Sequence, residues 1–199
     1  TGTYETHYIE VVDGSTFTLL TPLENDYLTS IGAIHQVIWV PNYTNVTVDG
    51  TLTCSGWDGA TGGIVFFRAT GTTTVNGSID VTGKGNRGGQ SQWSASSMAW
   101  QGESITGQGI QSIDNNNGAG GGGVGGDLNP YNPSWGGGGG GGSFGTMGEF
   151  GMQGDNGNGM PYTEPGMTYG YEILNNLFLG SGGGGGATDD NENCHPSDG

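Results

Sequence analysis

Basic side chains are nearly absent from this chain. Only three of its 199 residues are lysine or arginine, against 19 aspartates and glutamates, which gives a formal net charge of −16 at pH 7. A surface of this sign repels phosphate backbones and anionic lipid headgroups. The acidic residues are spread along the chain, as they are on an ordinary solvated surface. We therefore expect no nucleic-acid partner and no attachment to a membrane surface.

Long hydrophobic runs and cysteines are scarce as well. No stretch approaches the roughly 20 apolar residues that cross a bilayer, so we expect no membrane insertion. The chain begins at Thr1 without a signal peptide, which processing of a longer precursor would explain. Only Cys54 and Cys194 are present, and an even number in a lysine-poor chain fits an oxidising extracellular setting. One intramolecular bridge is the favoured interpretation; two separate thiols, or a bridge between subunits, are the alternatives.

Glycine is what the chain has in excess. Most of its 46 glycines follow residue 87, in runs such as Gly136–Gly142 and Gly182–Gly186. We therefore divide the chain into a strand-rich region, residues 1–87, and a glycine-rich region, residues 88–199, packed on it as one compact unit. Glycine loses the most backbone entropy on ordering, so such a region folds only where the missing Cβ lets backbones approach closely. Large side chains such as Phe144 and Tyr169 interrupt the runs and favour an ordered region over a flexible linker, although glycine-rich composition alone favours disorder.

Strand patterns fill the first region. Tyr4–Val12 and Thr16–Leu20 are rich in β-branched and aromatic residues and flank the turn dipeptide Asp13–Gly14, which predicts a hairpin. Short turns rich in glycine and asparagine separate the remaining predicted strands. These are Gln36–Val40, Asn45–Val48, Thr51–Cys54, Ile64–Ala69, Thr72–Val75 and Ser78–Val81.

Two of these strand pairs resemble each other. Residues 45–53 and 73–81 both contain V–x–G–[TS]–[LI], at a spacing of about 28 residues. A repeated strand–turn–strand unit favours stacked coils, each burying its apolar face against the next. The predicted fold is therefore all-β: a short-stranded β-solenoid or a β-sandwich, with an ordered glycine-rich lobe.

A resemblance to a known class of proteins rests on six stretches in the same order. They are Gln36–Val48, Gly56–Gly63, Val75–Ile79, Gly83–Gly89, Gln101–Glu103 and Leu179–Gly183. Together they look like a class of glycine-rich secreted bacterial surface proteins, over most of the chain. The resemblance implies an extracellular, β-rich, structural or adhesive module. A compositional analogy to the glycine-rich tips of phage adhesins implies that the lobe is polyglycine-II-like, a lattice of polyproline-II-like helices.

Residues for catalysis or metal binding are not arranged in a known motif. The three histidines, His7, His35 and His195, have no metal-ligand spacing, and no serine lies in a nucleophile elbow. We therefore expect no enzymatic activity and no cofactor. In the tail, Asp189, Asn191 and Asn193 resemble the start of a calcium loop, but the glycine at its sixth position and the glutamate at its twelfth are missing. Calcium is the weaker alternative to a solvated acidic tail.

Two groups of surface residues predict contacts with sugars. Asn42, Asn45 and Asn76 lie in sequons for N-glycosylation, although such triplets are frequent in a chain rich in Asn and Thr. The tryptophans Trp93, Trp100 and Trp135 could stack on sugar rings or fix the glycine-rich backbone to a core, and the second role is the more common one.

The function we expect is that of a non-enzymatic structural subunit of an extracellular filament or surface layer. Its partner would be a second copy of the chain, joined through β-strand and glycine-backbone contacts. The strand that could add to a neighbour's sheet contains Thr3, Tyr4, Thr6, Tyr8, Ile9 and Val11. The alternative is an adhesin that binds a carbohydrate or receptor at the cell surface.

Overall fold

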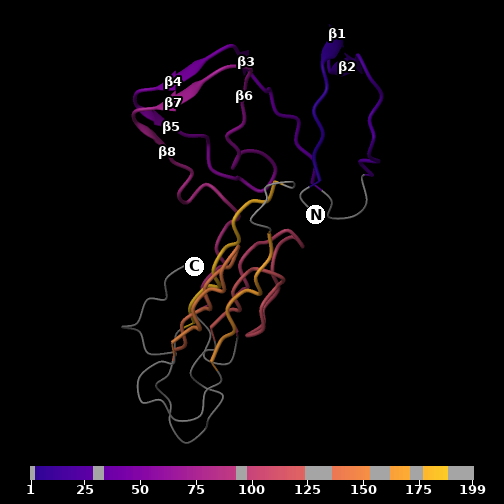
Figure 1. Ribbon diagram of the computed structural model, residues 1–199. Coiled ribbons are helices and arrows are strands. Elements are labelled where there is room, and N and C mark those ends of the chain that lie inside the picture. Colours follow the sequence, from indigo (N-terminus) through magenta and orange to yellow (C-terminus); the bar gives the residue numbers. More distant parts are fainter. Residues whose placement is uncertain are drawn as a thin grey trace, which may run out of the picture.

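The protein is all-β, as the strand patterns predict. The computed structural model describes residues 3–28, 34–92, 98–123, 136–152, 162–170 and 177–187, and these ranges contain eight short strands and no helix. Three parts follow one another along the chain: an N-terminal hairpin, a group of paired strands, and glycine-rich segments that extend away from the strands as an elongated body (Figure 1).

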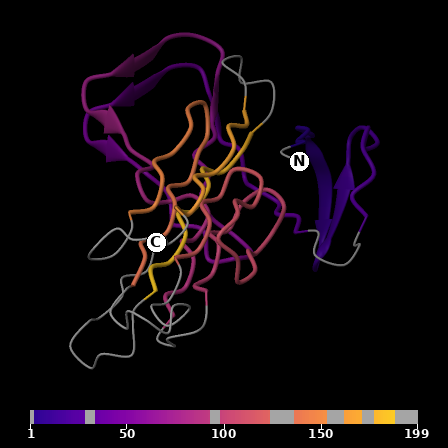
Figure 2. The same ribbon diagram turned by 90° about the horizontal axis from the view of Figure 1, so that it is seen from below.

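The hairpin consists of β1 (Ile9–Asp13) and β2 (Thr16–Leu19), which pair antiparallel. Gly14 has a φ of +58°, in the left-handed region that favours glycine, and it opens the two-residue turn between Asp13 and Thr16. The predicted hairpin is thus confirmed. Its first strand is shorter than predicted, since it begins at Ile9 and not at Tyr4. In both ribbon views the hairpin stands apart from the other strands (Figures 1 and 2).

The remaining strands form three parallel pairs. The chain makes a first pass over residues 42–52 and a second pass over residues 68–79, and each strand of the second pass lies beside one of the first. The pairs are β3 (Asn42–Tyr43) with β6 (Arg68–Ala69), β4 (Val46–Val48) with β7 (Thr73–Val75), and β5 (Thr51–Leu52) with β8 (Ser78–Ile79).

The corners of the two passes stack as well. Asn76 Nδ2 donates a hydrogen bond to Asp49 Oδ1 at 2.8 Å, across 27 residues of chain, and Ser78 Oγ donates to Thr51 Oγ1 at 3.1 Å. A Cβ on Gly77 would lie 2.1 Å from the Gly50 carbonyl oxygen, so the second corner requires glycine for space. The shared V–x–G–[TS]–[LI] motif therefore marks residues that lie on one another, with a period of 27 residues where the motif predicts about 28.

One strand prediction is wrong, and one strand was not predicted. Gln36–Val40 does not form a strand; instead the Gln36 side-chain amide donates to the Gly62 carbonyl at 3.2 Å and accepts from the Gly62 N–H at 3.1 Å. Asn42–Tyr43, which no pattern predicts as a strand, pairs with β6, and the Pro41 carbonyl accepts from Arg68 N–H. The other predicted strands are confirmed but are shorter than predicted: β4, β6 and β7 begin later, and β5 and β8 end earlier.

Buried side chains are few and small. Among the described residues, the buried apolar side chains are Val48, at 8% exposure, and three alanines, Ala99, Ala119 and Ala187. The paired strands therefore enclose only a thin apolar layer, and the alanines lie in the glycine-rich segments. The hydrophobic effect, roughly proportional to buried apolar area, contributes little per residue here.

The glycine-rich segments are joined mainly by backbone hydrogen bonds; we refer to residues 86–92, 98–123, 136–152, 162–170 and 177–187 as the glycine body. Its segment 180–187 is bonded to four other segments. Asn86 and Gly89 N–H donate to it, as do Gly120 and Gly123; it donates in turn to the carbonyls of Trp100, Glu103, Gly137 and Gly140. A β-strand has at most two hydrogen-bonded neighbours, one on each edge, so these segments form no ordinary sheet.

Close backbone approach explains why these positions are glycine. A Cβ on Gly184 would lie 1.8 Å from the Gly121 carbonyl oxygen, and one on Gly120 would lie 1.8 Å from the Gly140 carbonyl oxygen. Neither glycine has a positive φ, so the requirement is for space and not for an unusual backbone conformation.

An aromatic cluster covers one part of the glycine body. The rings of Phe144, Tyr169 and Phe178 meet edge to face, with centroids 5.2 to 6.5 Å apart. Tyr169 Oη donates to the Leu179 carbonyl at 2.5 Å and accepts from Ser181 Oγ at 2.9 Å. Burial raises the pKa of Tyr169 above its ordinary value. These aromatics hold glycine-rich backbone in place, which is the more common role predicted for such residues.

A charged joint connects the strands to the glycine body. Glu103 accepts hydrogen bonds from Arg87 Nε at 3.0 Å, from the Arg87 backbone N–H at 3.0 Å and from Trp57 Nε1 at 3.1 Å. Its side chain is only 7% exposed. Burial would raise the pKa of Glu103, but the Arg87 and Trp57 hydrogen bonds outweigh it and hold the pKa below its ordinary value. Arg87 also donates to the Asp58 carbonyl, so one side chain joins both regions.

Candidate assembly surface

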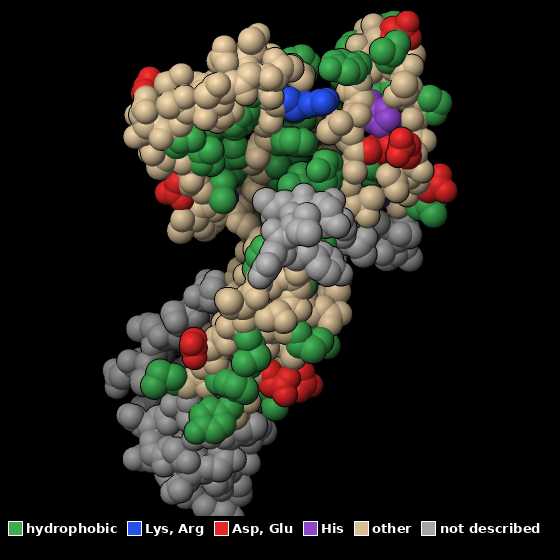
Figure 3. All heavy atoms as spheres, in the orientation of Figure 1, with side chains coloured by type: hydrophobic (Ala, Val, Ile, Leu, Met, Phe, Trp, Pro, Cys, Tyr) green, Lys and Arg blue, Asp and Glu red, His purple; other side chains and the backbone are tan. Residues whose placement is uncertain are grey.

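Large apolar side chains are exposed throughout the N-terminal part of the chain. Trp39 is 79% exposed and Val37 81%. Apolar side chains gather along the hairpin and inside the paired strands (Figure 3). Those exposed on the hairpin and the segments that flank it are Tyr8, Ile9, Val11, Val12, Phe17, Leu20, Leu23, Leu28, Ile34, Val37 and Trp39. Exposed apolar side chains in such number are typical of an interaction surface.

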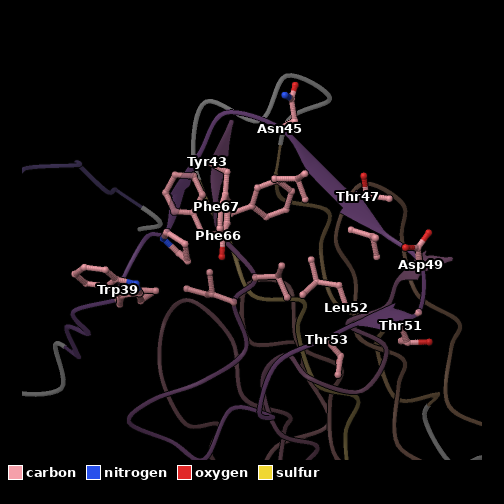
Figure 4. A pocket seen from close by; sticks show the side chains of 17 residues that line it. Trp39, Tyr43, Asn45, Thr47, Asp49, Thr51, Leu52, Thr53, Phe66 and Phe67 are labelled. Atoms are coloured by element: carbon pink, nitrogen blue, oxygen red, sulfur yellow. The ribbon is translucent and has the colours of Figure 1, made fainter. Parts of the chain in front are cut away.

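The first pass also opens into a hollow of about 680 Å³. Figure 4 shows Phe66 and Phe67 within the ring of strands, beside Tyr43 and Leu52, with Trp39 at the rim. The hollow's walls come from residues 38–53 of the first pass and from residues 64–67, which lead into the second. The interior of the first pass is therefore apolar and open.

The strand edges around this hollow are unpaired among the described residues. Each of β3, β4 and β5 has one neighbour, in the second pass, so its other edge has none. Backbone N–H and C=O groups on such an edge are a template for a further strand. The hairpin is in the same position: its two strands pair only with each other, and an isolated two-stranded hairpin is marginally stable in water.

A polar cluster holds the segment after the hairpin. The Glu5 carboxylate accepts from the backbone N–H groups of Glu24 at 2.7 Å and Asn25 at 3.2 Å, and it contacts His7 Nε2 at 2.7 Å. The Glu24 hydrogen bond is the largest of the interactions that lower the pKa of Glu5 to about 2; those of His7, Tyr27 and Asn25 add to it, against a smaller rise from burial. This cluster explains why the first predicted strand starts late: Glu5 binds a loop and not a sheet.

The same cluster contains a chain of groups that resembles a catalytic triad. Thr21 Oγ1 lies 2.9 Å from His7 Nδ1, and the other ring nitrogen of His7, Nε2, contacts Glu5. A nucleophile, a base and an acid follow this order in hydrolases. Here the Glu5 carboxylate accepts hydrogen bonds from the two loop N–H groups of Glu24 and Asn25. Neither it nor His7 nor Thr21 lines the hollow. The contacts account for a structural role in anchoring residues 21–25.

The predicted assembly strand lies partly outside any strand. Ile9 and Val11 belong to β1 and are exposed, whereas Thr3, Tyr4, Thr6 and Tyr8 precede it. The Tyr4 ring packs edge-on against Phe66 at 5.9 Å between centroids, which brings the N-terminal segment to the hollow. Because one edge of β1 is bonded to β2, only its other edge remains for a neighbour.

The three sequon asparagines all lie on the paired strands or their corners, and all are exposed. Asn42 Nδ2 donates to the Val40 carbonyl and Asn76 Nδ2 to Asp49, so both amide nitrogens have partners. Asn45 binds through its oxygen, which accepts from Thr72 N–H at 2.8 Å. Glycosylation at these sites stays a prediction.

Several predicted site residues lie outside the described ranges: Trp93, Trp135, Cys194 and the calcium candidates Asp189, Asn191 and Asn193. Cys54 is half-buried just after β5, and its bridge to Cys194 stays a prediction. Trp100 lies in the glycine body and is 38% exposed. Over the described ranges, no cluster of three His, Cys, Asp or Glu side chains could hold a metal ion, and no helix is long and apolar enough to cross a membrane.

An exposed patch on the glycine body was not predicted. The Phe150 and Tyr162 rings meet edge to face with centroids 6.4 Å apart, and both are more than half exposed. Met152, at 81% exposure, lies two residues from Phe150. In the sequence these residues appear only as interruptions of glycine runs, which indicates anchoring and not exposure.

The comparisons with known proteins leave the family open. No protein-family model, no curated protein and no solved structure matches the chain.

Proposed function

We propose that the chain is a non-enzymatic structural subunit of an extracellular filament or surface layer, joined to its neighbours through the N-terminal half. The observation that carries this proposal is a difference in unpaired backbone groups and exposed apolar side chains between the N-terminal half and the glycine body. The hairpin and the first pass have unpaired edges and exposed apolar side chains, whereas the glycine body uses its backbone groups on itself. Among the described residues, the free strand edges available for assembly therefore lie in the N-terminal half.

The finer fold proposal is that the two passes are coils of a β-solenoid. Three parallel pairs, offset by 26 residues for β3 and β6 and by 27 for the other two, and stacked corners at Asp49 and Asn76 support it. A coil buries its apolar face against the next coil, so about three or more repeats are needed for stability. Two passes with an open hollow are thus an incomplete stack, which further strands from another chain would extend.

The glycine body is, in this proposal, a polyglycine-II-like lattice. In such a lattice each extended helix has threefold symmetry and can bond to neighbours in several directions, which agrees with the four bonded neighbours of segment 180–187. Carbonyl oxygens lie where side chains would be, as at Gly120 and Gly184. The body would serve as a rigid spacer that projects from the assembled strands.

Deleting Thr1–Val12 tests the proposal. We expect the truncated chain to remain folded, with an unchanged glycine body, and to lose the regular assemblies that electron microscopy shows for the full chain. Because the deletion also removes Glu5, a full-length variant is needed. Val12→Lys places a charge on the exposed side of β1, and Ile110→Lys, at an equally exposed apolar position of the glycine body, is its control. Assemblies that persist in both N-terminal variants would exclude joining through the N-terminal strand.

A second candidate, an adhesin, is favoured by the exposed Phe150, Tyr162 and Met152 patch, because aromatic faces stack on sugar rings. A glycan array probed with the full chain should then show selective binding that Tyr162→Ala abolishes. Tyr8→Ala, which removes a similarly exposed tyrosine from the N-terminal half, is the matched control. Absence of binding to any glycan would exclude a carbohydrate-binding adhesin and support the structural function.

A further inference from the structure

We propose that two copies of the chain join through β4, antiparallel and about a twofold axis at Thr47. This inference deepens the proposed function, on which it rests, by naming the partner and the contact. The first pass is suited to such a contact because its apolar interior is open and its strands have a free edge. The strand at its centre, β4, has a sequence that complements itself.

The backbone of β4 presents one residue to the free edge. Val46 N–H donates to the Thr72 carbonyl at 3.0 Å, and the Val48 carbonyl accepts from Asn76 N–H at 2.9 Å, so both valines direct their polar groups at the second pass. Successive residues of a strand direct these groups to opposite edges. Thr47 N–H and C=O therefore point away from β7, at the edge that no described strand occupies.

This arrangement matches one antiparallel pairing. In a hydrogen-bonded antiparallel pair, two opposed residues exchange both N–H···O bonds, with Cα atoms about 5.5 Å apart. A twofold axis through the middle of such a pair makes the two residues identical. Thr47 opposite its own copy thus satisfies both free groups on each chain, and β7–β4 would continue into the partner as one four-stranded sheet.

The side chains beside Thr47 fit the same axis. Val46 comes to lie opposite the partner's Val48, so the two apolar interiors face each other on the same side of the sheet and cover each other's hollow. Asn45 comes to lie opposite the partner's Asp49. Asn45 Oδ1 is bonded to Thr72 N–H and Asp49 Oδ1 to Asn76, which leaves an amide donor and a carboxylate acceptor to meet across the interface.

A head-to-tail contact lacks this complementarity at the same strand. A head-to-tail contact would pair β4 of one copy with β7 of another. The second pass, which contains β7, is also the part of the chain from which the glycine body continues, on the side of β8 (Figure 1). The isologous contact leaves both glycine bodies free, and by itself it closes at a dimer. Further growth would then use the hairpin.

Residue-resolved amide exchange tests the pairing without a mutation. Val46 and Val48 N–H should be protected at every protein concentration, because β7 holds them. Thr47 N–H should exchange as an open edge in dilute protein and slow by at least about tenfold as dimers form, with the mass followed by sedimentation. Thr47 exchange that is equally fast at all concentrations would overturn the inference.

Two variants sharpen the result. Asn45→Asp keeps the oxygen that Thr72 N–H needs but opposes two carboxylates across the axis, so it should weaken the dimer at least about tenfold. Thr47→Pro removes the N–H that only the partner uses and should abolish the dimer. Gln111→Glu makes the same amide-to-carboxylate change at an exposed position of the glycine body and should leave the dimer unchanged. A dimer that tolerates both β4 variants contradicts the proposal.

The outcomes separate this inference from the proposed function. Regular assemblies in which Thr47 stays unprotected would exclude the β4 contact and leave the structural function standing. Dimers with a protected Thr47 that never form larger assemblies, with or without the hairpin, would keep the β4 contact and exclude the filament or layer.

Discussion

The strands and the glycine body order their backbones by different means. In the strands, parallel pairs of two or three residues meet at corners, and side chains such as Asn76 and Asp49 fix the stack. In the glycine body, backbone donors meet backbone acceptors on several sides, and small residues let the segments approach. Among the described residues, the strands have free edges and surround an open apolar hollow.

The difference shows how the described part of the chain can be ordered with few buried side chains. Burial of large side chains is the usual compensation for lost conformational entropy, and the described residues have little of it. The glycine body replaces it with dense backbone hydrogen bonding and dispersion contacts at short distance. The strands have no such replacement, so we expect them to depend on a partner.

Adding one methyl group inside the glycine body should have the largest effect on stability. In Gly184→Ala, the Cβ would lie 1.8 Å from the Gly121 carbonyl oxygen, and backbone on both sides must move. We expect a loss of about 3 kcal/mol in the free energy of unfolding, at the upper end of overpacking effects. Thermal unfolding gives the stability, and amide exchange should show lost protection over residues 118–123 and 180–187.

Gly180→Ala is the control for that substitution. It lies in the same segment, but no atom lies within 4 Å of its added Cβ. We expect a neutral or slightly stabilising effect, up to about 1 kcal/mol, because alanine reduces the entropy of the unfolded chain. Equal losses in both variants would show that flexibility, and not space, fixes glycine here, which would remove the contrast between the two regions.

Removing the charge at the joint should have an intermediate effect. Glu103→Gln weakens the hydrogen bonds from Arg87 and Trp57, and we expect a loss of about 2 kcal/mol at neutral pH, as for hydrogen bonds to a charged group. Because the folded-state pKa of Glu103 is lowered, the wild-type advantage is present above the ordinary glutamate pKa and disappears as pH falls through the lowered one.

Chemical unfolding as a function of pH checks this joint prediction. Glu149→Gln, at an exposed position of the glycine body, should match the wild type at every pH. A constant deficit for Glu103→Gln down to the lowest pH would mean that shape, and not charge, connects the strands to the glycine body.

Local patterns in the sequence predicted the hairpin and the repeat. Asp13–Gly14 flanked by β-branched residues, and the paired V–x–G–[TS]–[LI] motifs, depend on turn chemistry that a few neighbouring residues determine. The strand prediction for Gln36–Val40 is wrong. There the Gln36 side-chain amide bonds to Gly62, which is 26 residues away, and local patterns do not show such a distant contact. Strand lengths were overestimated because residues of high β-propensity continue beyond the two or three that pair in each strand.

The candidate surface was only partly accessible from the sequence. The N-terminal strand was predicted as an assembly element, but the free edge of β4 could not be, because the direction of Thr47 N–H depends on its pairing with β7. Nor could composition distinguish Phe144, which packs on Tyr169, from the exposed Phe150. Both follow a glycine run, and only the packing of distant segments separates their roles.

The smallest effect is expected at the anchor of the N-terminal segment. Glu5→Gln weakens acceptance from the Glu24 and Asn25 N–H groups, so those two amides should exchange faster while the midpoint of thermal unfolding stays unchanged. The hydrogen bond from Glu24 N–H, with those from His7, Tyr27 and Asn25, lowers the pKa of Glu5 to about 2. The wild-type carboxylate therefore remains ionised at pH 3 and should still protect the two amides at that pH. Glu10→Gln, on the exposed strand β1, should change neither amide. Protection that is already lost in the wild type at pH 4 would contradict the anchor.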